Sequence, residues 1–300
     1  MYNEKIIDTH MHLWDLKNNY PWLMNNAAPL ITLGGNYDKL KQTFLVKDYV
    51  ALTKNQNIAK SIHVEAFGFE GNPVLETQWL QKQADQFGFP HGIVARAELH
   101  DPDVKSILKQ HCQYPNVRGI RMALNYHPGL NLQIADRGDY LRDKEWRKGF
   151  ALLQNYNLVF DLQVFDNQIE DAASLAKEFP NTHIIIEHFG WPLDISENGF
   201  NLWYQRMALI AENKNVFMKL SAIGWVFKQA DLNVIKKYIS SAIELFGIDR
   251  CMFGSNFPPD SMFYNFDELV NVFKQIFMVY SAADQHKLFY GNAEKIYRLE

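Results

Sequence analysis

The sequence has few cysteines and no long apolar run, and each absence excludes a class of protein. Its 300 residues include only Cys112 and Cys251, which are too sparse for a disulfide framework or a Cys-x-x-Cys metal site. No stretch approaches the ~18 apolar residues that cross a bilayer, and the first residues lack the apolar core of a signal peptide. We therefore expect a soluble, cytoplasmic protein with no membrane partner.

An excess of charge of one sign is also absent. Thirty Lys and Arg residues stand against 34 Asp and Glu residues, a net charge of -4, so no broad basic surface can hold a nucleic acid. Hydrophobic residues make up 47% of the chain and include 21 Phe, 14 Tyr and 7 Trp, enough for a large core. The composition predicts a globular protein, monomeric or a small homo-oligomer, whose partner is a small molecule.

Short apolar, β-branched runs alternate with segments of helical spacing along the whole chain, as in βα units around a parallel sheet. Strands are expected at 5–9, 61–66, 92–97, 117–121, 158–164, 183–188, 216–221 and 250–254. Helices are expected at 47–57, 75–87, 103–114, 144–156, 168–179, 202–213, 231–246 and 267–278. Eight units without a linker predict an α/β fold, a single-domain (β/α)8 TIM-like barrel over residues 1–300.

The turn after the first strand lacks a glycine-rich phosphate loop and carries histidines instead. His10 and His12 are two residues apart on extended chain, so their imidazoles project from one face and can chelate one cation. A third histidine, His188, ends the apolar run 184–186 and strengthens the case, although a lone histidine there is more often a hydrogen-bonded barrel residue than a ligand. His63 is expected to lie in the core.

Polar side chains at the carboxyl ends of barrel strands face the end of the barrel where active sites form. The candidates in this position are Glu65, Arg121, Asp161, Gln163, Lys219 and Asn256. The two cations could bind substrate, or they could pair with the acids as a buried structural network. The sequence leaves both interpretations open.

Several of these residues belong to motifs that occur in a characteristic order. They are IDTHMHLWD (7–15), VEA (64–66), RGIR (118–121), DRGDYL (136–141), FDLQV (160–164), EHFGWP (187–192), KLS (219–221) and CMFGSNFP (251–258). The ordered set resembles the amidohydrolase superfamily. It is most similar to the amidohydrolase-related branch with sugar-acid lactonases of the L-fuconolactonase and L-rhamnonolactonase type and pyrone dicarboxylate lactonase.

The resemblance implies a (β/α)8 hydrolase that attacks a cyclic ester or a related carbonyl. It places His10, His12 and His188 at a metal or polarising site, with His188 also catalytic. The expected cofactor is one divalent metal ion, zinc foremost. The alternative is no metal, with the histidines and Arg121 polarising the carbonyl directly.

The chain departs from the superfamily pattern after the eighth strand. Many members have an aspartate there that binds metal and accepts a proton, whereas this sequence has Asn256. An amide is a weak ligand and cannot act as a base near neutrality, so another group must take the proton. The candidates for this role are Glu65, Asp161 and Asp260.

The leading functional hypothesis is hydrolysis of a small lactone, a sugar-acid lactone, by water attack on a polarised carbonyl in carbohydrate metabolism. Arg121, Gln163, Lys219 and Asn256 would then bind the substrate. One alternative is a metal-dependent decarboxylase of the same superfamily. Another, motivated by Asn256, is a catalytically lapsed barrel that binds a sugar acid.

Two long βα loops account for the length of the chain beyond the ~250 residues of a typical barrel. They are expected at 13–46 and 122–143, on the catalytic face, where they would act as a lid. They carry Trp14, Trp22 and His127, which we expect to form walls for a ring-shaped substrate. Exchanging these loops should change substrate choice more than stability.

Overall fold

Eight parallel strands form one sheet whose spatial order follows the sequence, from β1 to β8. The computed structural model describes residues 2–24, 37–69, 71–129, 134–228 and 230–299. The strands are β1 Ile6–Met11, β2 Ile58–Val64, β3 Gly92–Arg96, β4 Val117–Ala123, β5 Val159–Gln163, β6 Ile184–Ile186, β7 Val216–Leu220 and β8 Cys251–Phe253. Each segment predicted as a strand contributes one of them.

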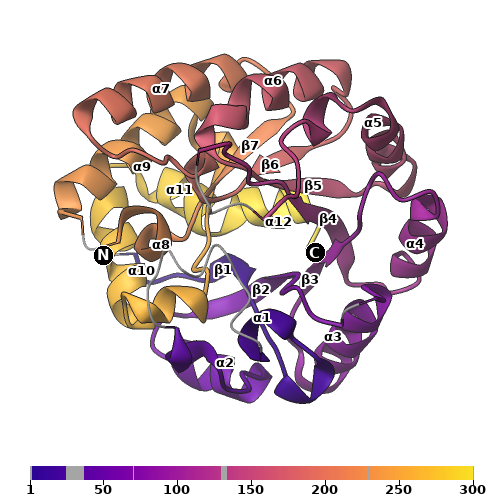
Figure 1. Cartoon of the computed structure of the whole chain (residues 1–300). Helices are drawn as coiled ribbons and strands as arrows, with labels where there is room; N and C mark the ends of the chain where they lie inside the picture. The colour runs from indigo at the N-terminus through magenta and orange to yellow at the C-terminus, as the bar shows by residue number, and fades with distance from the viewer. Residues whose placement is uncertain (1, 25–36, 70, 130–133, 229, 300) are drawn as a thin grey trace.

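Helices surround the ring of strands, as Figure 1 shows. The eight predicted helices are α2 Val46–Thr53, α3 Val74–Phe87, α4 Val104–His111, α5 Lys144–Ala151, α6 Ile169–Glu178, α7 Glu197–Ala211, α9 Leu232–Phe246 and α10 Phe266–Phe277. The prediction missed the short helices α1 Pro21–Met24, α8 Ile223–Phe227, α11 Ala282–His286 and α12 Asn292–Tyr297. Segments of four to six residues carry too little periodicity to reveal a helix.

Helix α7 begins five residues earlier than its apolar spacing predicts. Ser196 is its N-cap, and the Ser196 hydroxyl accepts a hydrogen bond from the backbone N–H of Gly199 at 3.2 Å. A serine cap stabilises the first turn by satisfying a free N–H, so the helix starts in a polar stretch where hydrophobic spacing has no signal.

The sheet is nearly closed into a barrel where β1 meets the segment after β8. The N–H of His12 donates to the carbonyl of Phe257 at 2.8 Å, and the N–H of Asn256 donates to the carbonyl of His10 at 2.6 Å. Gly254 permits this approach, because a Cβ there would lie 2.9 Å from the Cβ of His10. The predicted (β/α)8 architecture is confirmed.

The C-terminal helix α12 packs against an inner apolar cluster of the barrel strands. Ile296 and Tyr297 of α12 contact this cluster, which includes Ile7 of β1 and Val64 of β2. Tyr297 is fully buried, and its hydroxyl reaches the carboxylate of Asp161 in β5. The barrel interior is therefore covered at the end from which α12 approaches, and its polar residues gather towards the opposite end.

The two loops predicted as a lid are only partly covered by the structure, because residues 25–36 and 130–133 lie outside the described residues. The described part of the first loop is tied to the loop after β2. The indole N–H of Trp22 donates to the carbonyl of Ala66 at 2.7 Å, and the N–H of Phe69 donates to the carbonyl of Asn19 at 3.0 Å. Among the described helices, none is long and apolar enough to cross a membrane.

Candidate active site

Three histidines, His10, His12 and His188, lie together at the carboxyl ends of β1 and β6, and we call them the histidine cluster. The Nε2 atoms of His10 and His12 are 3.2 Å apart, and the rings of His10 and His188 have centroids 4.5 Å apart. All three are buried, with His12 the most exposed at 6%. The structure thus places His10 beside both His12 and His188, but the described group whose ligand atoms all lie within 4.8 Å of one another is His10, Glu187 and His188, without His12.

Two histidines of the cluster, His12 and His188, are held by a hydrogen bond through Nδ1, whereas the Nδ1 atom of His10 makes no hydrogen bond with a described residue. The Nδ1 atom of His12 donates to the carbonyl of Val64 at 2.7 Å, and that of His188 lies 2.9 Å from the hydroxyl of Ser221. The Nδ1 atom of His10 lies 3.2 Å from the Oε1 atom of Glu187. Anchoring one ring nitrogen on a carbonyl, hydroxyl or carboxylate is how metal-binding histidines are oriented, with Nε2 left for the ligand.

The backbone is strained at two of the residues that face this site. His188 and Asn256 both adopt left-handed conformations, with φ of 55° and 57°. His188 therefore lies in a short turn after β6, although the sequence predicted a strand through residue 188. Left-handed backbone costs a non-glycine residue roughly 1–2 kcal/mol, so surrounding contacts must enforce it.

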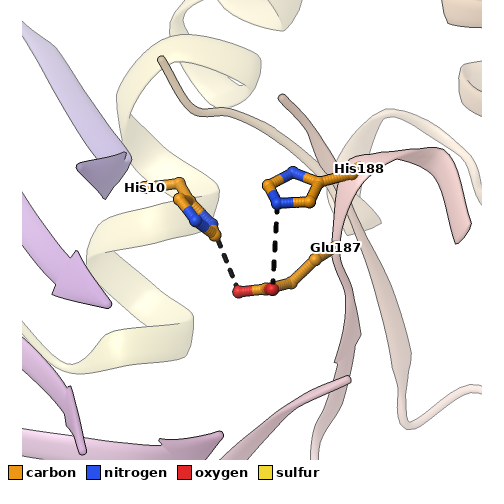
Figure 2. Close-up of side chains that lie close together, drawn as sticks. All are labelled: His10, Glu187 and His188. Carbon is orange, nitrogen blue, oxygen red and sulfur yellow. Dashed lines mark ion pairs between the residues drawn. The ribbon is translucent and has the colours of Figure 1, made fainter. Parts of the chain in front are cut away.

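Glu187 is central to the site, and the sequence reasoning did not select it. A ligand atom of His10, one of Glu187 and one of His188 all lie within 4.8 Å of one another. Figure 2 shows these three side chains pointing towards a common point. The sequence does indicate Glu187, because it follows an apolar strand and directly precedes His188. The prediction chose only the histidine of this pair.

Five charged residues form a second buried group, the ionic cluster. They are Glu65, Arg121, Asp161, Glu187 and Lys219. Arg121 donates to Glu65 from its Nε atom at 2.7 Å and lies 3.1 Å from Glu187 through Nη1, which also donates to Gln163 at 2.7 Å. The sequence left open whether the cations Arg121 and Lys219 pair with acids of the protein. In the structure they do.

The lower part of the ionic cluster joins β5, β7 and the C-terminal helix. Lys219 is fully buried, pairs with Asp161, and lies 3.8 Å from the Oε1 atom of Glu187. The Tyr297 hydroxyl lies 2.8 and 3.1 Å from the two carboxylate oxygens of Asp161. Glu187 connects the two clusters, because it faces Arg121 and Lys219 on one side and His10 on the other.

Asn256 and Asp260 form a third element, after β8. The Asn256 amide donates to Asp260 at 2.9 Å, and the second oxygen of Asp260 accepts from the N–H of Gly224 at 2.9 Å. This contact turns the amide oxygen of Asn256 towards the Nε2 atom of His12, 3.3 Å away. Asp260 has no ion pair among the described residues, in contrast to Glu65 and Asp161.

Burial controls the protonation of the site. Desolvation holds the pKa values of His10, His12 and His188 well below their ordinary range, so these imidazoles are neutral at pH 7. Burial also raises the pKa of Asp260 to about 7, opposed by the hydrogen bond from Asn256. Burial acts in the same direction on Glu187, but His10 and Arg121 outweigh it and hold the pKa of Glu187 well below its usual range.

The donor set fits a divalent cation in two respects. First, three carboxylates of the ionic cluster stand against two cations, which leaves one uncompensated negative charge beside neutral histidines. Second, His12 carries its proton on Nδ1, so the bare Nε2 atom faces the amide oxygen of Asn256 with no proton between them. The 3.2 Å between the Nε2 atoms of His10 and His12 matches the separation of about 3.3 Å for two nitrogens on tetrahedral zinc.

The aromatic residues predicted to line the substrate site lie in the loops after β1 and β4. Trp14 is buried, and its indole N–H donates to the carbonyl of Gln42 at 2.6 Å, whereas Trp22 is partly buried and meets Trp14 edge to face. His127 is partly exposed, and its Nδ1 atom accepts from the N–H of Gly129. His63 is fully buried, as predicted, and accepts from the N–H of Leu13 at 3.0 Å.

The family model for amidohydrolases matches residues 7–299, nearly the whole chain. An eight-stranded barrel with histidines at the carboxyl ends of β1 and β6 is consistent with this match. The chain belongs to the amidohydrolase family.

Relatives with known sequences and structures cover the chain from end to end. The uncharacterized protein y4mH of Sinorhizobium fredii is 40% identical over 296 residues, 98% of each chain. An L-fucono-1,5-lactonase of Burkholderia multivorans is 24% identical over 308 residues, covering 98% of this chain and 96% of that protein. A crystal structure of an amidohydrolase from Burkholderia multivorans with bound zinc has a TM-score of 0.83 at 23% identity, covering 98% and 99% of the two chains.

Proposed function

We propose that this protein hydrolyses a small lactone of a sugar acid. The observation that carries the proposal is the histidine cluster, in which His12 and His188 are fixed through Nδ1 and the Nε2 atoms of His10 and His12 lie 3.2 Å apart at the carboxyl end of the barrel. Resemblance to an L-fucono-1,5-lactonase along the whole chain supports a cyclic ester as the substrate. Hydrolysis of an ester needs a polarised carbonyl and a group that removes a proton from water.

The histidine cluster supplies the polarising part of this mechanism. A divalent ion held by His10, His12 and His188 would polarise the ester carbonyl when bound. Zinc is our first choice for this ion, because a relative of the same fold binds it. Glu187 holds the ring of His10 in position and keeps a negative charge beside it. Asn256 presents its amide oxygen at the same place.

Asp260 is our choice for the group that takes the proton from water. Glu65 and Asp161 accept hydrogen bonds from the buried cations Arg121 and Lys219, so their carboxylates are already engaged within the protein. Asp260 has hydrogen-bond donors but no cation, and burial raises its pKa to about 7. A carboxyl group with a pKa near the working pH can both accept and release a proton.

The first test measures lactone hydrolysis by acid release, with a pH indicator and a panel of aldonolactones. We expect His12→Ala and His188→Ala to lower kcat/KM by at least about 100-fold while the melting temperature changes little. His183→Ala is the matched control, because His183 precedes β6 at the end away from His188 and meets the ring of Phe217 edge to face. Full activity in both cluster variants would overturn the proposal.

The second test addresses Asp260 through the pH profile. Because the base must be ionised, kcat should rise as the pH increases through about 7 in the wild type, and this rise should disappear in Asp260→Asn. Binding of zinc is checked separately by metal analysis and by the increase in melting temperature when Zn2+ is added to chelator-treated protein. An unchanged acid limb in Asp260→Asn would remove Asp260 from this role.

A further inference from the structure

Arg121 has no hydrogen-bond donor left for a substrate. A guanidinium has five N–H donors, and here every one faces a protein acceptor. Its Nε atom donates to Glu65 Oε1, Nη1 donates to Gln163 and Glu187, and Nη2 lies against the backbone carbonyl of Glu65 at 2.6 Å and Glu65 Oε1 at 2.7 Å. The side chain is also nearly sealed, with 3% exposed. Arg121 was expected from the sequence to bind substrate, but the structure leaves it no free donor for this role.

The ammonium group of Lys219 is also occupied by partners within the protein. Its ammonium group is fully buried, pairs with Asp161, and faces Glu187 and the ring of Tyr297. A substrate carboxylate would have to displace Asp161, which Tyr297 holds by a further hydrogen bond. The second predicted cation is thus also unavailable.

No other buried cation among the described residues can take this place. Lys274 is the remaining buried one, and it lies on α10, where its ammonium donates to Gln56 at 2.9 Å. The residues outside the described ranges contain no lysine or arginine at all. Arg96 ends β3 at the rim, is partly exposed and donates to Glu98 from two of its nitrogens.

Two neutral hydrogen-bond donors, unlike the buried cations, are not occupied by acceptors of the described protein. The Nδ2 atom of Asn125, just after β4, and the Nε1 atom of Trp225, in α8 after β7, are buried and have no acceptor among the described residues. The amide oxygen of Asn125 accepts from Gln163 at 2.9 Å, which turns its Nδ2 group away from that partner. A buried N–H without an acceptor costs roughly 1–3 kcal/mol, which a ligand oxygen would recover.

We propose that the site takes an uncharged lactone, an aldonolactone whose ring carries only hydroxyl, hydroxymethyl or methyl groups, and rejects lactones that bear a free carboxylate. This inference rests on the proposed lactonase function and narrows its substrate class. A carboxylate entering the barrel would lose its hydration and find both buried cations taken by protein carboxylates. Hydroxyl oxygens of a neutral sugar ring can instead accept from Asn125 and Trp225.

The test compares matched pairs of substrates. Each pair is an aldonolactone and the same lactone with its terminal CH2OH oxidised to a carboxylate, assayed under identical conditions. We expect kcat/KM to be at least about 100-fold lower for the carboxylate member, because an unpaired buried charge is strongly disfavoured. Comparable kcat/KM values within the pairs, or loss of carbon dioxide from an aromatic carboxylate, would overturn the proposal.

A pair of variants tests whether the ionic cluster causes the discrimination against carboxylate-bearing lactones. Glu65→Gln removes the charge that two donors of Arg121 face, so we expect the discrimination against carboxylates to fall at least about tenfold. Glu76→Gln is the control, because Glu76 is also buried, accepts from the N–H of Ala66, and forms no ion pair with Arg121 within the described part of the chain. Equal discrimination in Glu65→Gln, once its circular dichroism matches the wild type, would contradict the assignment.

Binding separates this proposal from the failure of the lactonase function. If no lactone is hydrolysed, the proposed function is wrong, and the melting temperature is then measured with a neutral sugar lactam and its carboxylate counterpart. Stabilisation by the neutral lactam alone supports an uncharged ligand. Stabilisation by the carboxylate lactam, or by neither compound, overturns the proposal.

Discussion

The ionic cluster and the histidine cluster lie within one barrel but differ in how their polar atoms are satisfied. In the ionic cluster, Arg121 and Lys219 spend their donors on carboxylates and an amide of the protein itself. In the histidine cluster, the Nδ1 atoms of His12 and His188 are anchored, and the Nε2 atoms of His10 and His12 face each other at 3.2 Å. A group with complete internal pairing stabilises the fold, whereas a group with converging free lone pairs is arranged for a ligand.

The comparison teaches that charge alone does not mark a binding residue. Both clusters are buried and both consist of residue types common in active sites. What separates them is the number of unoccupied donors and lone pairs, because only those can act on a substrate. Changes in the ionic cluster should therefore appear mainly in stability, and changes in the histidine cluster mainly in turnover.

The largest expected effect on stability is from Lys219→Met. Removing the ammonium leaves Asp161 and Glu187 as buried carboxylates without their shared cation, which should cost about 3–5 kcal/mol in the free energy of unfolding. Urea denaturation at pH 7 measures the change. His188→Ala, measured in parallel, should lose less, and a larger loss in His188→Ala than in Lys219→Met would break the distinction between the clusters.

A smaller effect is expected from Tyr297→Phe, which removes only the hydroxyl that α12 places on Asp161. A buried hydrogen bond to a carboxylate contributes roughly 1.5–3 kcal/mol, so the free energy of unfolding should fall by about that amount. Tyr290→Phe is the control, because its hydroxyl donates to Glu294 at 2.9 Å in a more exposed setting. Equal losses in the two variants would show that burial does not strengthen the hydrogen bond from Tyr297 to Asp161.

The smallest change, expressed per pH unit, concerns Glu76, a buried glutamate that has no ion pair among the described residues. Burial, reinforced by the charge of Glu65, raises the pKa of Glu76 to about 8. Between about 4.5 and 8 the folded state therefore holds a proton that the unfolded state has released, and this group makes stability decrease as pH rises, by up to about 1.4 kcal/mol per pH unit.

Replacing Glu76 by Gln removes this titration. We expect Glu76→Gln to lose less stability than the wild type between pH 6 and 9, measured by thermal unfolding in matched buffers. Glu197→Gln, at an exposed glutamate paired with Lys237, should retain the wild-type slope. Identical slopes for the wild type and Glu76→Gln would mean that Glu76 is ionised in the folded protein at neutral pH.

Local pattern was sufficient for much of the fold and for part of the site. Alternating apolar runs predicted eight strands, and the spacing of His10 and His12 predicted that they share a face. Both inferences depend on neighbours within a few residues, where the period of a strand determines direction. The left-handed turn at His188 and the early start of α7 were missed because a strained backbone and a serine cap leave little hydrophobic signal.

The sequence by itself determined the βα order, the histidine pair of β1 and the set of polar residues at the strand ends. Only the tertiary structure decided which of those residues are paired: Arg121 with Glu65, Lys219 with Asp161, and Glu187 between the two clusters. The physical reason is that partners across a barrel are set by strand register and barrel closure, which join residues more than 50 positions apart. Residue type states what a side chain can do, and its partners decide whether it is free to do it.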